Sequence, residues 1–313
     1  MTEDRLDLEV VSRRDVGGRI AILELRAPDE SPLPEWAPGA HIDIHIADGL
    51  TRQYSLSGSP ADRQRWRIAV LREEGGRGGS RAIFDGLVPG ATVRAGSPRN
   101  HFGLVDADEY VFIAGGIGIT PMVPMLTAVR EQGKRSSLTY FGREVSSMAF
   151  ADELASLAGV TIAAKDDGPV ATVVSILTAA SRGAAVYVCG PDRLVEEVTA
   201  RCEALGIAAP RVEHFAPMQV DTAGDTSFDL YIDSLDKWVT VPPDRSIVDV
   251  VEDEGLYVVT SCLEGTCGSC ETPILEGEAE HRDSVLSEEE RRAQTCMMIC
   301  VSRACTATIK LDL

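Results

Sequence analysis

The 313-residue sequence has no apolar run of 18 residues, and its amino terminus lacks a basic start followed by an apolar stretch. The first absence argues against a membrane-spanning helix, and the second argues against a secretory signal peptide. Eight cysteines in a chain without an export signal point to a reducing compartment and to metal ligation. We therefore expect a cytoplasmic monomer with no membrane partner.

Basic residues are also scarce, with 30 Lys and Arg against 49 Asp and Glu and a net charge of −19. The imbalance is strongest from residue 221 onwards, where 20 acidic residues stand against 7 basic ones. Such a field repels phosphate backbones, so we expect no nucleic-acid partner. Two interpretations of the acidic surface stay open: it maintains solubility, or it guides this part of the chain onto a basic partner protein.

The five histidines form no pair at metal-binding spacing, whereas four cysteines carry a specific pattern. Cys262, Cys267 and Cys270 are spaced C-x4-C-x2-C, and Cys300 follows after 29 residues. This is the plant-type spacing for a [2Fe–2S] cluster held by four thiolates. A zinc site usually pairs two short cysteine units, and a disulfide framework fits small secreted chains, so both are weaker interpretations.

The cysteine segment resembles a plant-type ferredoxin, in which the fourth ligand lies far downstream before a closing strand. Cys300 has that setting in M-M-I-C-V-S-R. Cys296 and Cys305 lie nearby, so the fourth ligand is less directly assigned than the first three. We interpret these two cysteines as packed or surface thiols.

Residues 1–103 carry short strand-like runs punctuated by Gly and Pro, and this pattern predicts a small antiparallel β-barrel. The first run is expected at Leu6–Val11, and His41–Ile46 alternates as H-I-D-I-H-I. At Gly76–Ser80 the sequence reads G-R-G-G-S before a short helix that we expect Ser80 to cap. Free amides at such a helix start can bind an anion, although the stretch is also typical of a surface turn.

The strand at Arg52–Leu56 reads R-Q-Y-S-L. Its alternation places Arg52, Tyr54 and Leu56 on one side and Ser55 on the other.

Residues 104–216 alternate strand-like and helical segments, which predicts a parallel, doubly wound α/β sheet. The buried strand Glu109–Gly115 runs into G-G-I-G-I-T-P at Gly115–Pro121 and then into a helix. Strand, glycine turn and helix form the unit that binds a pyrophosphate. A second motif, Y-V-C-G-P at Tyr187–Pro191, follows another strand, and the site of such a sheet lies at the carboxyl ends of its strands. We interpret Cys202 as a packing residue.

Residues 217–226 lack apolar periodicity and are interpreted as a linker. Residues 227–313 show a hairpin, a short helix closed by Gly255, the cysteine loop and a capping box at Ser287 and Glu290. This order is the β-grasp pattern of ferredoxins, an α+β fold. The predicted protein therefore has three domains.

Across its whole length the chain resembles the ferredoxin–NADP reductase superfamily. R-Q-Y-S-L with S-P-R-N-H-F at Ser97–Phe102 and R-E-E-G-G-R-G-G-S narrows the resemblance to the group of phthalate dioxygenase reductase and vanillate O-demethylase reductase. The resemblance implies FMN in preference to FAD. It also implies NADH. NADPH stays open, because Arg143 could bind a 2′-phosphate, whereas Glu144 could accept a hydrogen bond from the ribose 2′-hydroxyl of NADH.

The same resemblance assigns roles to individual residues. Arg52, Gly79 and Ser80 would bind the flavin phosphate, Tyr54 would lie along the ring, and Ser55 would hydrogen-bond near the flavin N5. Cys189 would lie beside the nicotinamide, and Phe215, near Glu213, would cover the flavin ring or is an aromatic core residue. The implied catalytic residues are Ser55, Cys189 and Phe215. The implied cofactor-binding residues are Arg52, Tyr54, Ser55, Leu56, Gly79 and Ser80 for the flavin, and Gly115, Gly116, Gly118, Thr120, Pro121, Gly190 and Pro191 for the nucleotide.

The expected function is transfer of electrons from NADH through FMN and the cluster to a Rieske-type non-haem iron oxygenase acting on an aromatic substrate. Two alternatives stay open. The acceptor could be a cytochrome P450, or the chain could be an electron-relay subunit without a hydride-transfer reaction of its own.

Overall fold

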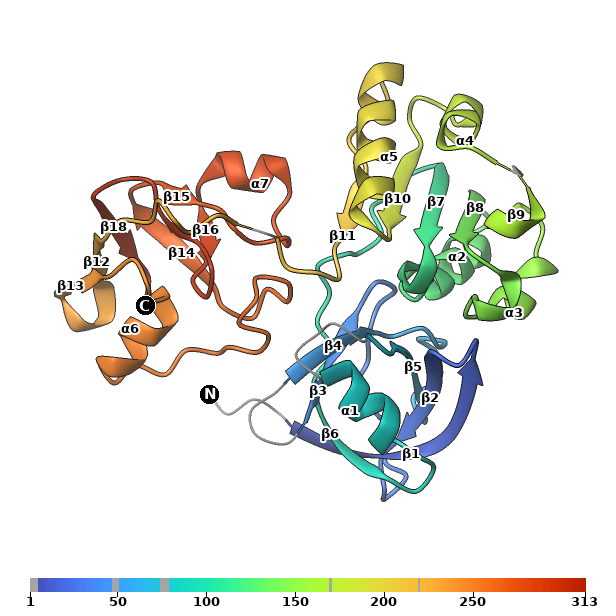
Figure 1. Ribbon diagram of the computed structural model, residues 1–313, viewed down its shortest axis with the longest axis horizontal. Coiled ribbons are helices and arrows are strands. Elements are labelled where there is room, and N and C mark those ends of the chain that lie inside the picture. The colour runs from blue at the N-terminus through green and yellow to red at the C-terminus, as the bar shows by residue number, and fades with distance from the viewer. Residues whose placement is uncertain (1–4, 47–50, 74–78, 169–170, 219) are drawn as a thin grey trace. The chain divides into compact units, whose positions relative to one another are not determined.

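The computed structural model describes residues 5–46, 51–73, 79–168, 171–218 and 220–313 (Figure 1). The chain divides into two compact units, residues 1–213 and residues 214–313. In the described residues, no helix has both the length and the apolar character needed to span a membrane.

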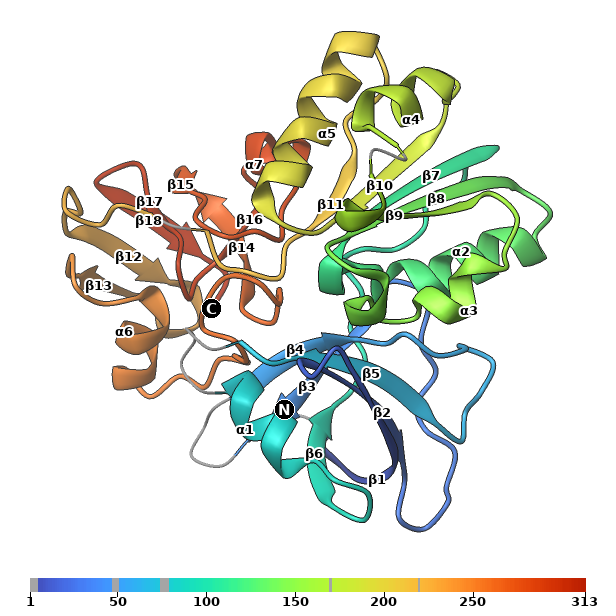
Figure 2. The same cartoon turned by 45° about the vertical axis from the view of Figure 1, so that its right-hand side comes forward.

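The first unit begins with a six-stranded antiparallel sheet that curls around an apolar core (Figure 2). Its strand order is β4-β3-β6-β1-β2-β5, and helix α1 packs against its edge strands. The core is filled from alternate positions of each strand, and Trp66 is fully buried there. Its elements are β1 (Arg5–Val16), β2 (Ile20–Arg26), β3 (His41–His45), β4 (Thr51–Ser55), β5 (Trp66–Leu71), α1 (Gly79–Gly86) and β6 (Thr92–Gly96).

Strand β1 is longer than predicted. The sequence pattern ends at Val11, but the strand continues to Val16. The pairing with β2 shifts register between Val10 and Ser12, so the alternation of buried and exposed residues is interrupted there. An irregularity of this kind hides the second half of a strand from a pattern of period two.

The second sheet of this unit is parallel, with strand order β11-β10-β7-β8-β9. Helices α2 and α3 cover one face, and α4 and α5 cover the other (Figures 1 and 2). Strand β7 shows why both faces are buried, since Tyr110 and Phe112 contact one apolar cluster and Val111 and Ile113 contact the other. Its elements are β7 (Glu109–Gly115), η2 (Gly116–Ile119), α2 (Met122–Glu131), β8 (Arg135–Gly142), η3 (Val145–Ser147), α3 (Ala151–Ala155), β9 (Val160–Ala164), η4 (Lys165–Asp167), α4 (Val173–Ala179), β10 (Ala185–Cys189), α5 (Asp192–Leu205) and β11 (Arg211–Glu213).

The barrel and the parallel sheet share one apolar core. Ile20, Ile22 and Ala69 of the barrel belong to the same buried cluster as Tyr140 and Phe150 of the α/β part. Because these side chains are buried only when both sheets are packed, the two sheets form one compact unit.

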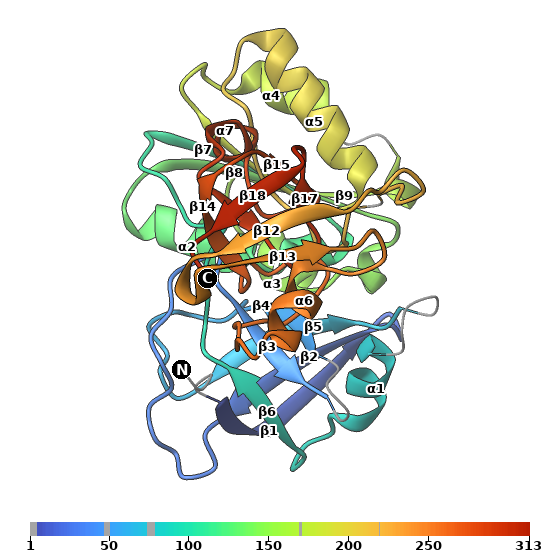
Figure 3. The ribbon, with the colours of Figure 1, turned by 90° about the vertical axis from the view of Figure 1, so that its left-hand side faces the viewer.

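The second unit contains a mixed five-stranded sheet of order β13-β12-β18-β14-β16 (Figure 3). Strands β12 and β18 are parallel, the other pairs are antiparallel, and helix α6 packs its apolar side into the core. Its elements are β12 (Phe228–Ile232), η5 (Asp233–Leu235), β13 (Lys237–Val241), α6 (Ile247–Asp253), β14 (Glu271–Glu276), β15 (Ala279–Glu280), α7 (Glu288–Ala293), β16 (Cys296–Met298), β17 (Arg303–Ala304) and β18 (Thr308–Leu311). The predicted fold class, with barrel, doubly wound sheet and β-grasp sheet, is confirmed.

Of the two helix caps predicted at serine residues, the structure confirms one. Ser287 and Glu290 form the predicted capping box of α7. Ser80, however, lies within α1 and not at its cap, because the helix begins at Gly79, and the Ser80 hydroxyl accepts a hydrogen bond from the Glu73 amide at 3.2 Å. The predicted boundaries 1–103, 104–216, 217–226 and 227–313 stay predictions.

A buried ion network ties Asp225, which lies in the predicted linker, to the second unit. Two Arg282 nitrogens donate to the Asp225 carboxylate at 2.9 and 2.5 Å, and the two side chains are 8% and 7% exposed. Arg282 also pairs with Glu280, and Arg303 lies 3.8 Å from Asp225. The hydrogen bond from Arg282 lowers the pKa of Asp225 below its usual 3.8.

Asp225→Asn should destabilise the second unit. Removing one charge of a buried pair usually costs about 3–5 kcal/mol, and we expect about 2–3 kcal/mol because Asn keeps an acceptor oxygen and Glu280 still pairs with Arg282. Urea unfolding of the full chain at pH 7 would measure this loss. Asp221→Asn, an exposed position nearby, is the matched control.

The pH dependence gives a second check on Asp225. A carboxyl whose folded-state pKa is lowered stabilises the fold above its unfolded pKa and loses this contribution as the pH falls. The stability difference between the natural chain and Asp225→Asn should therefore shrink below pH 3.8. A difference that stays constant down to pH 3 would contradict this assignment.

Candidate functional site

The four candidate cluster ligands lie together in the second unit. Cys262, Cys267, Cys270 and Cys300 are each at most 8% exposed. Thiols of Cys267 and Cys300 hydrogen-bond to the Cys262 sulfur, which lowers the pKa of Cys262 and raises the pKa values of both partners. Cys270 and Cys300 also hydrogen-bond, and this contact lowers the pKa of Cys270. The sulfurs therefore converge although Cys300 is distant in sequence.

Backbone amides surround these sulfurs. The N–H groups of Glu264 and Thr266 point at the Cys262 sulfur at 3.3 and 3.4 Å, and that of Ser269 points at Cys267 at 3.5 Å. Donors of this kind stabilise negative charge on a thiolate and help set the potential of an iron–sulfur group.

Gly265 is required by close packing. Its φ is +70°, and a Cβ there would lie 2.6 Å from the Val301 side chain and 3.1 Å from the Asp283 backbone. The Gly265 carbonyl accepts a hydrogen bond from the Ser284 amide at 2.9 Å. The cysteine loop is thus held against Val301, which follows Cys300, and against residues 283–284.

Among the described residues, no group of three or more His, Cys, Asp or Glu side chains is arranged around a single metal ion. A two-iron cluster does not need three ligands around one ion, because each iron is bound by only two thiolates. The sulfur pairs described above are therefore the contacts that such a cluster requires. All four sulfurs are buried, soft ligands, and this donor set fits a [2Fe–2S] cluster. Cys296 is half-buried and Cys305 exposed, and Cys202 is buried in the core under α4 and α5.

The two glycine-bearing motifs of the first unit meet at the carboxyl edge of the parallel sheet. A Cβ on Gly118 would lie 2.3 Å from the Cys189 carbonyl oxygen, and one on Gly115 would lie 2.8 Å from the Pro191 ring. Gly190 in turn packs on the Gly115 backbone, where a Cβ would lie 3.0 Å away. Only residues without a side chain permit this approach of η2 to the end of β10.

The turn between β7 and α2 also carries Gly116, Thr120 and Pro121. Gly116 has φ +56°, and the Thr120 hydroxyl donates to the Ile117 carbonyl at 3.0 Å. Pro121 precedes the first residue of α2, so the missing N–H of Pro leaves no intrahelical bond unmade. The turn is therefore stabilised by hydrogen bonds between its own residues. The amino-terminal N–H groups of α2 lie at the edge of the sheet, as expected for a phosphate-binding turn.

Cys189 and Glu213 lie side by side at the same edge. They are register partners in β10 and β11, and Cys189 is fully buried. Burial, followed by the charge of Glu213, raises the pKa of the Cys189 thiol. Glu213 as a whole is only partly buried, but its Oε2 is buried and has no hydrogen-bond partner among the described residues, and burial raises its pKa to about 8. Phe215, two residues on, is 46% exposed.

The candidate flavin strand β4 lies at an edge of the barrel sheet and pairs only with β3 among the described strands. Tyr54 and Arg52 pair with Ile42 and Ile44, so they share one side of the strand, as predicted, and this side faces the barrel core. Burial raises the pKa of the Tyr54 hydroxyl, and Leu56 is fully buried.

Ser55, on the other face of β4, is buried. Gly79 and Ser80 begin helix α1, which packs near β4. Residues 74–78 of the predicted phosphate loop, including Gly76, lie outside the described residues. An edge strand beside a helix start fits a flavin phosphate and ring, because one side of β4 has no strand partner among the described residues and amides at a helix start can bind a phosphate.

A polar network beside Ser55 was missed by the sequence analysis. Asp43 is fully buried and accepts hydrogen bonds from Gln53 at 2.8 Å and Arg99 at 2.7 Å. Asp43 lies on the same face of the barrel as Ser55 by strand register. The only local signal was an acidic residue between His41 and His45, on the polar side of the alternation in β3.

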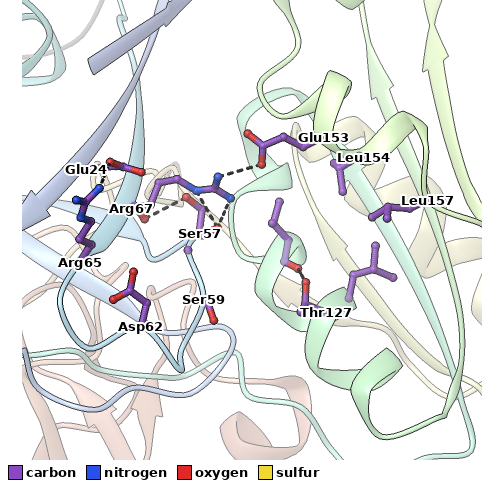
Figure 4. A pocket seen from close by; sticks show the side chains of 13 residues that line it. Glu24, Ser57, Ser59, Asp62, Arg65, Arg67, Thr127, Glu153, Leu154 and Leu157 are labelled. Atoms are coloured by element: carbon purple, nitrogen blue, oxygen red, sulfur yellow. Dashed lines mark hydrogen bonds and ion pairs between the residues drawn. The ribbon is translucent and has the colours of Figure 1, made fainter. Parts of the chain in front are cut away.

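A cavity of about 380 Å³ separates part of the barrel from α2 and α3 (Figure 4). Arg67 reaches across one side of it: its guanidinium donates to the Ser57 carbonyl at 2.7 Å, pairs with Glu153 at 2.9 Å and lies over the Phe150 ring at 4.5 Å. Arg14 also pairs with Glu153 at 2.9 Å. Ser57 directly follows the candidate flavin residues 52–56. By binding both Ser57 and Glu153, Arg67 links the end of this segment to the α/β part.

The chain is similar to known proteins over nearly its whole length. Residues 230–307 match the 2Fe-2S iron-sulfur cluster binding domain family. The chain is 38% identical over 297 residues to the phenoxybenzoate dioxygenase subunit beta of Ectopseudomonas oleovorans, covering 94% of this chain and 93% of that protein. It is 35% identical over 315 residues to phthalate dioxygenase reductase of Burkholderia cepacia, covering 98% and 97%.

Solved structures give the same result. The structure described as phthalate dioxygenase reductase, modular for electron transfer from pyridine nucleotides to [2Fe-2S], matches with a TM-score of 0.71 at 35% identity and covers 99% of this chain and 98% of that one. Full-length CYP116B46 from Tepidiphilus thermophilus matches with a TM-score of 0.87 at 38% identity, and this chain spans 42% of it.

The three sheets and the four-thiol centre define an iron–sulfur oxidoreductase. The chain belongs to the oxygenase-reductase family that includes phthalate dioxygenase reductase. The predicted family and the predicted [2Fe–2S] cofactor are thereby confirmed.

Gly118→Ala should destabilise the first unit, because its Cβ would lie 2.3 Å from a backbone oxygen that cannot move aside easily. Overpacking of this kind typically costs about 1–3 kcal/mol. Gly183→Ala is the matched control, since a Cβ there meets nothing within 4 Å. Urea unfolding of both variants would test the prediction, and equal stability of the two would contradict it.

Glu213→Gln should change the pH dependence of stability. A carboxyl with a raised folded-state pKa is buried neutral at low pH, and its penalty grows as the pH rises from 4.5 to about 8. The natural chain should therefore lose stability relative to Glu213→Gln over this interval, by on the order of 1 kcal/mol for a partly exposed group. Parallel stability curves of the two proteins between pH 5 and 8 would contradict the prediction.

Proposed function

We propose that this protein is the reductase component of a multicomponent oxygenase, and that it takes electrons from NADH through FMN and a [2Fe–2S] cluster to a separate Rieske-type oxygenase. The observation that carries the proposal is that a single chain combines a glycine-lined edge of a parallel sheet with a buried four-thiol centre. Relatives matched over nearly their full length are named as reductase subunits of phthalate 4,5-dioxygenase and of carnitine monooxygenase.

When bound, FMN supplies the conversion of a two-electron hydride into single electrons, and the cluster supplies one-electron transfer. Arg52 with the Gly79–Ser80 helix start would neutralise the flavin phosphate, while Tyr54 would provide an apolar surface for the ring. Ser55 would donate to the ring from the opposite face of the strand. The chain thus contributes binding and orientation to the flavin.

At the nucleotide edge, Gly115, Gly116 and Gly118 with Thr120 and Pro121 would accommodate the pyrophosphate. Cys189, Gly190 and Pro191 would form the wall against the nicotinamide, and burial of Cys189 excludes water from that wall. Burial raises the pKa of Cys189, so the thiol stays neutral and this wall stays uncharged. Phe215 is exposed and belongs to the second unit, and its role at the flavin ring stays a prediction from the sequence.

In the second unit, Cys262, Cys267, Cys270 and Cys300 would hold the cluster, with the amides of Glu264, Thr266 and Ser269 donating to its thiolates.

A cytochrome P450 is the second candidate acceptor. This alternative is supported by the similarity to full-length CYP116B46, a longer protein in which 42% of the chain matches 99% of this one. The internal electron path proposed here would be the same, so the acceptor has to be tested directly.

The test uses the purified full-length protein under anaerobic conditions. The proposal predicts a flavin and iron–sulfur absorption spectrum, release of FMN on acid treatment, and reduction of cytochrome c with NADH in preference to NADPH. A Rieske oxygenase and a P450 are then offered as acceptors in separate assays. A colourless protein, or one that needs a second subunit before NADH is oxidised, would overturn the proposal.

Cys267→Ser should separate the two redox functions. Loss of the cluster should lower NADH–cytochrome c activity at least about 50-fold, while NADH–ferricyanide activity stays within about twofold because the residues proposed to bind the flavin phosphate and ring belong to the other unit. Cys305→Ser, an exposed thiol in the same unit, is the control and should keep both activities. Loss of ferricyanide activity in Cys267→Ser would contradict the independence of the two units.

A further inference from the structure

The segment that leads into the first cluster cysteine exposes apolar side chains in a regular pattern. Residues 256–260 belong to none of the described helices or strands, yet alternate positions face in opposite directions. Leu256 and Val258 pack against the core of the second unit, whereas Tyr257 and Val259 are 70% and 40% exposed. An ordinary connecting loop would place polar residues at the outward positions.

Leu263, directly after Cys262, is a further exposed apolar residue close to this segment in sequence. Its side chain is 54% exposed, and its backbone has φ +56°. Gly or Asn is the usual residue in this left-handed conformation, because a larger side chain is strained there. An exposed leucine at a strained position contributes nothing to the core, so its apolar side chain points to a role at the surface.

The unit that carries these residues is strongly acidic. From residue 221 onwards 20 Asp and Glu stand against 7 Lys and Arg, and Glu252 and Asp253 at the end of α6 are exposed just before the segment. An apolar centre within a charged surround is the composition of a protein docking site. The charge also excludes two other occupants, since a second copy of this unit and an anionic lipid surface would both be repelled.

We propose that Tyr257, Val259 and Leu263, here called the cluster-side patch, dock the electron-accepting protein. The occupant is a separate redox protein with an apolar centre and a basic rim around its own metal group. The inference rests on the proposed function and names the surface that serves it. Each encounter moves one electron from the reduced cluster to the acceptor metal, no atom is transferred, and NADH is the source of the electrons.

The acidic surround and the patch act at different stages of the encounter. Opposite charges speed the approach of a basic acceptor, and this contribution weakens as salt rises. The apolar contact holds the complex and is insensitive to screening. Removing the patch should therefore raise the KM for the acceptor at every salt concentration and leave the salt dependence itself unchanged.

The test uses the full-length holoenzyme and cytochrome c, a basic redox protein, as the probe. The variant Tyr257→Ser with Leu263→Asn removes the two most exposed apolar groups, and Asn tolerates the positive φ of position 263. We expect at least a fivefold higher KM for cytochrome c, with the NADH-driven bleaching of the cluster unchanged. The higher KM should persist between 50 and 500 mM NaCl.

The matched control is Trp238→Ser. Trp238 is 46% exposed in the same unit, but it lies on β13, at the opposite edge of the sheet from β14 and β16, which adjoin Cys270 and Cys300. This variant should keep the KM of the natural protein. If the double variant lost iron, Tyr257→Ser alone, outside the cysteine loop, would be measured instead and should still raise the KM at least twofold.

Three outcomes would overturn the inference. An unchanged KM in the patch variants would show that the acceptor docks elsewhere, and an equal effect of Trp238→Ser would show a general loss of apolar surface. Slower bleaching of the cluster by NADH would mean that the patch serves electron transfer within this chain. A natural protein that fails to reduce cytochrome c would instead overturn the proposed function, and the role of the patch with it.

Discussion

The packing of two sheets around one apolar core is the constraint on which the first unit depends. Ile20 and Ile22 of the barrel are buried by the same cluster that contains Phe112 and Phe150 of the α/β part. Arg67 adds a polar link at the rim of this core, from the Ser57 carbonyl to Glu153. Hydride transfer requires two rings in contact, and misplacement by about 1 Å can cost a hundredfold in rate. A shared core supplies that precision.

Short-range patterns in the sequence were sufficient for the elements that carry the chemistry. The C-x4-C-x2-C spacing, the G-G-I-G-I-T-P turn and the Ser287 capping box each depend on residues that lie within nine positions of each other. The family and fold class followed from these patterns together with the resemblance they carry. The strand β1 was cut short because its register shift at Val10–Ser12 breaks the alternation on which strand prediction depends.

Long-range polar contacts could not be predicted, because no local rule links their partners. Asp43 and Arg99 are 56 residues apart, Arg67 and Glu153 are 86 apart, and Asp225 and Arg282 are 57 apart. Each pair forms only after the sheets have folded, and each lies beside a predicted functional segment. The close approach of Gly118 to Cys189 belongs to the same class: both motifs were visible in the sequence, but their contact was not.

The two units meet different physical demands, and their surfaces differ accordingly. The first unit must hold two organic rings in register, which a rigid core and glycine-lined backbone contacts provide. The second unit must release single electrons to a partner that leaves again, so tight binding would slow turnover. Most of the chain's excess negative charge lies on that second unit. In the docking that we propose, charge would steer a partner over about 8 Å at physiological salt without holding it long, and the cluster-side patch would then align it.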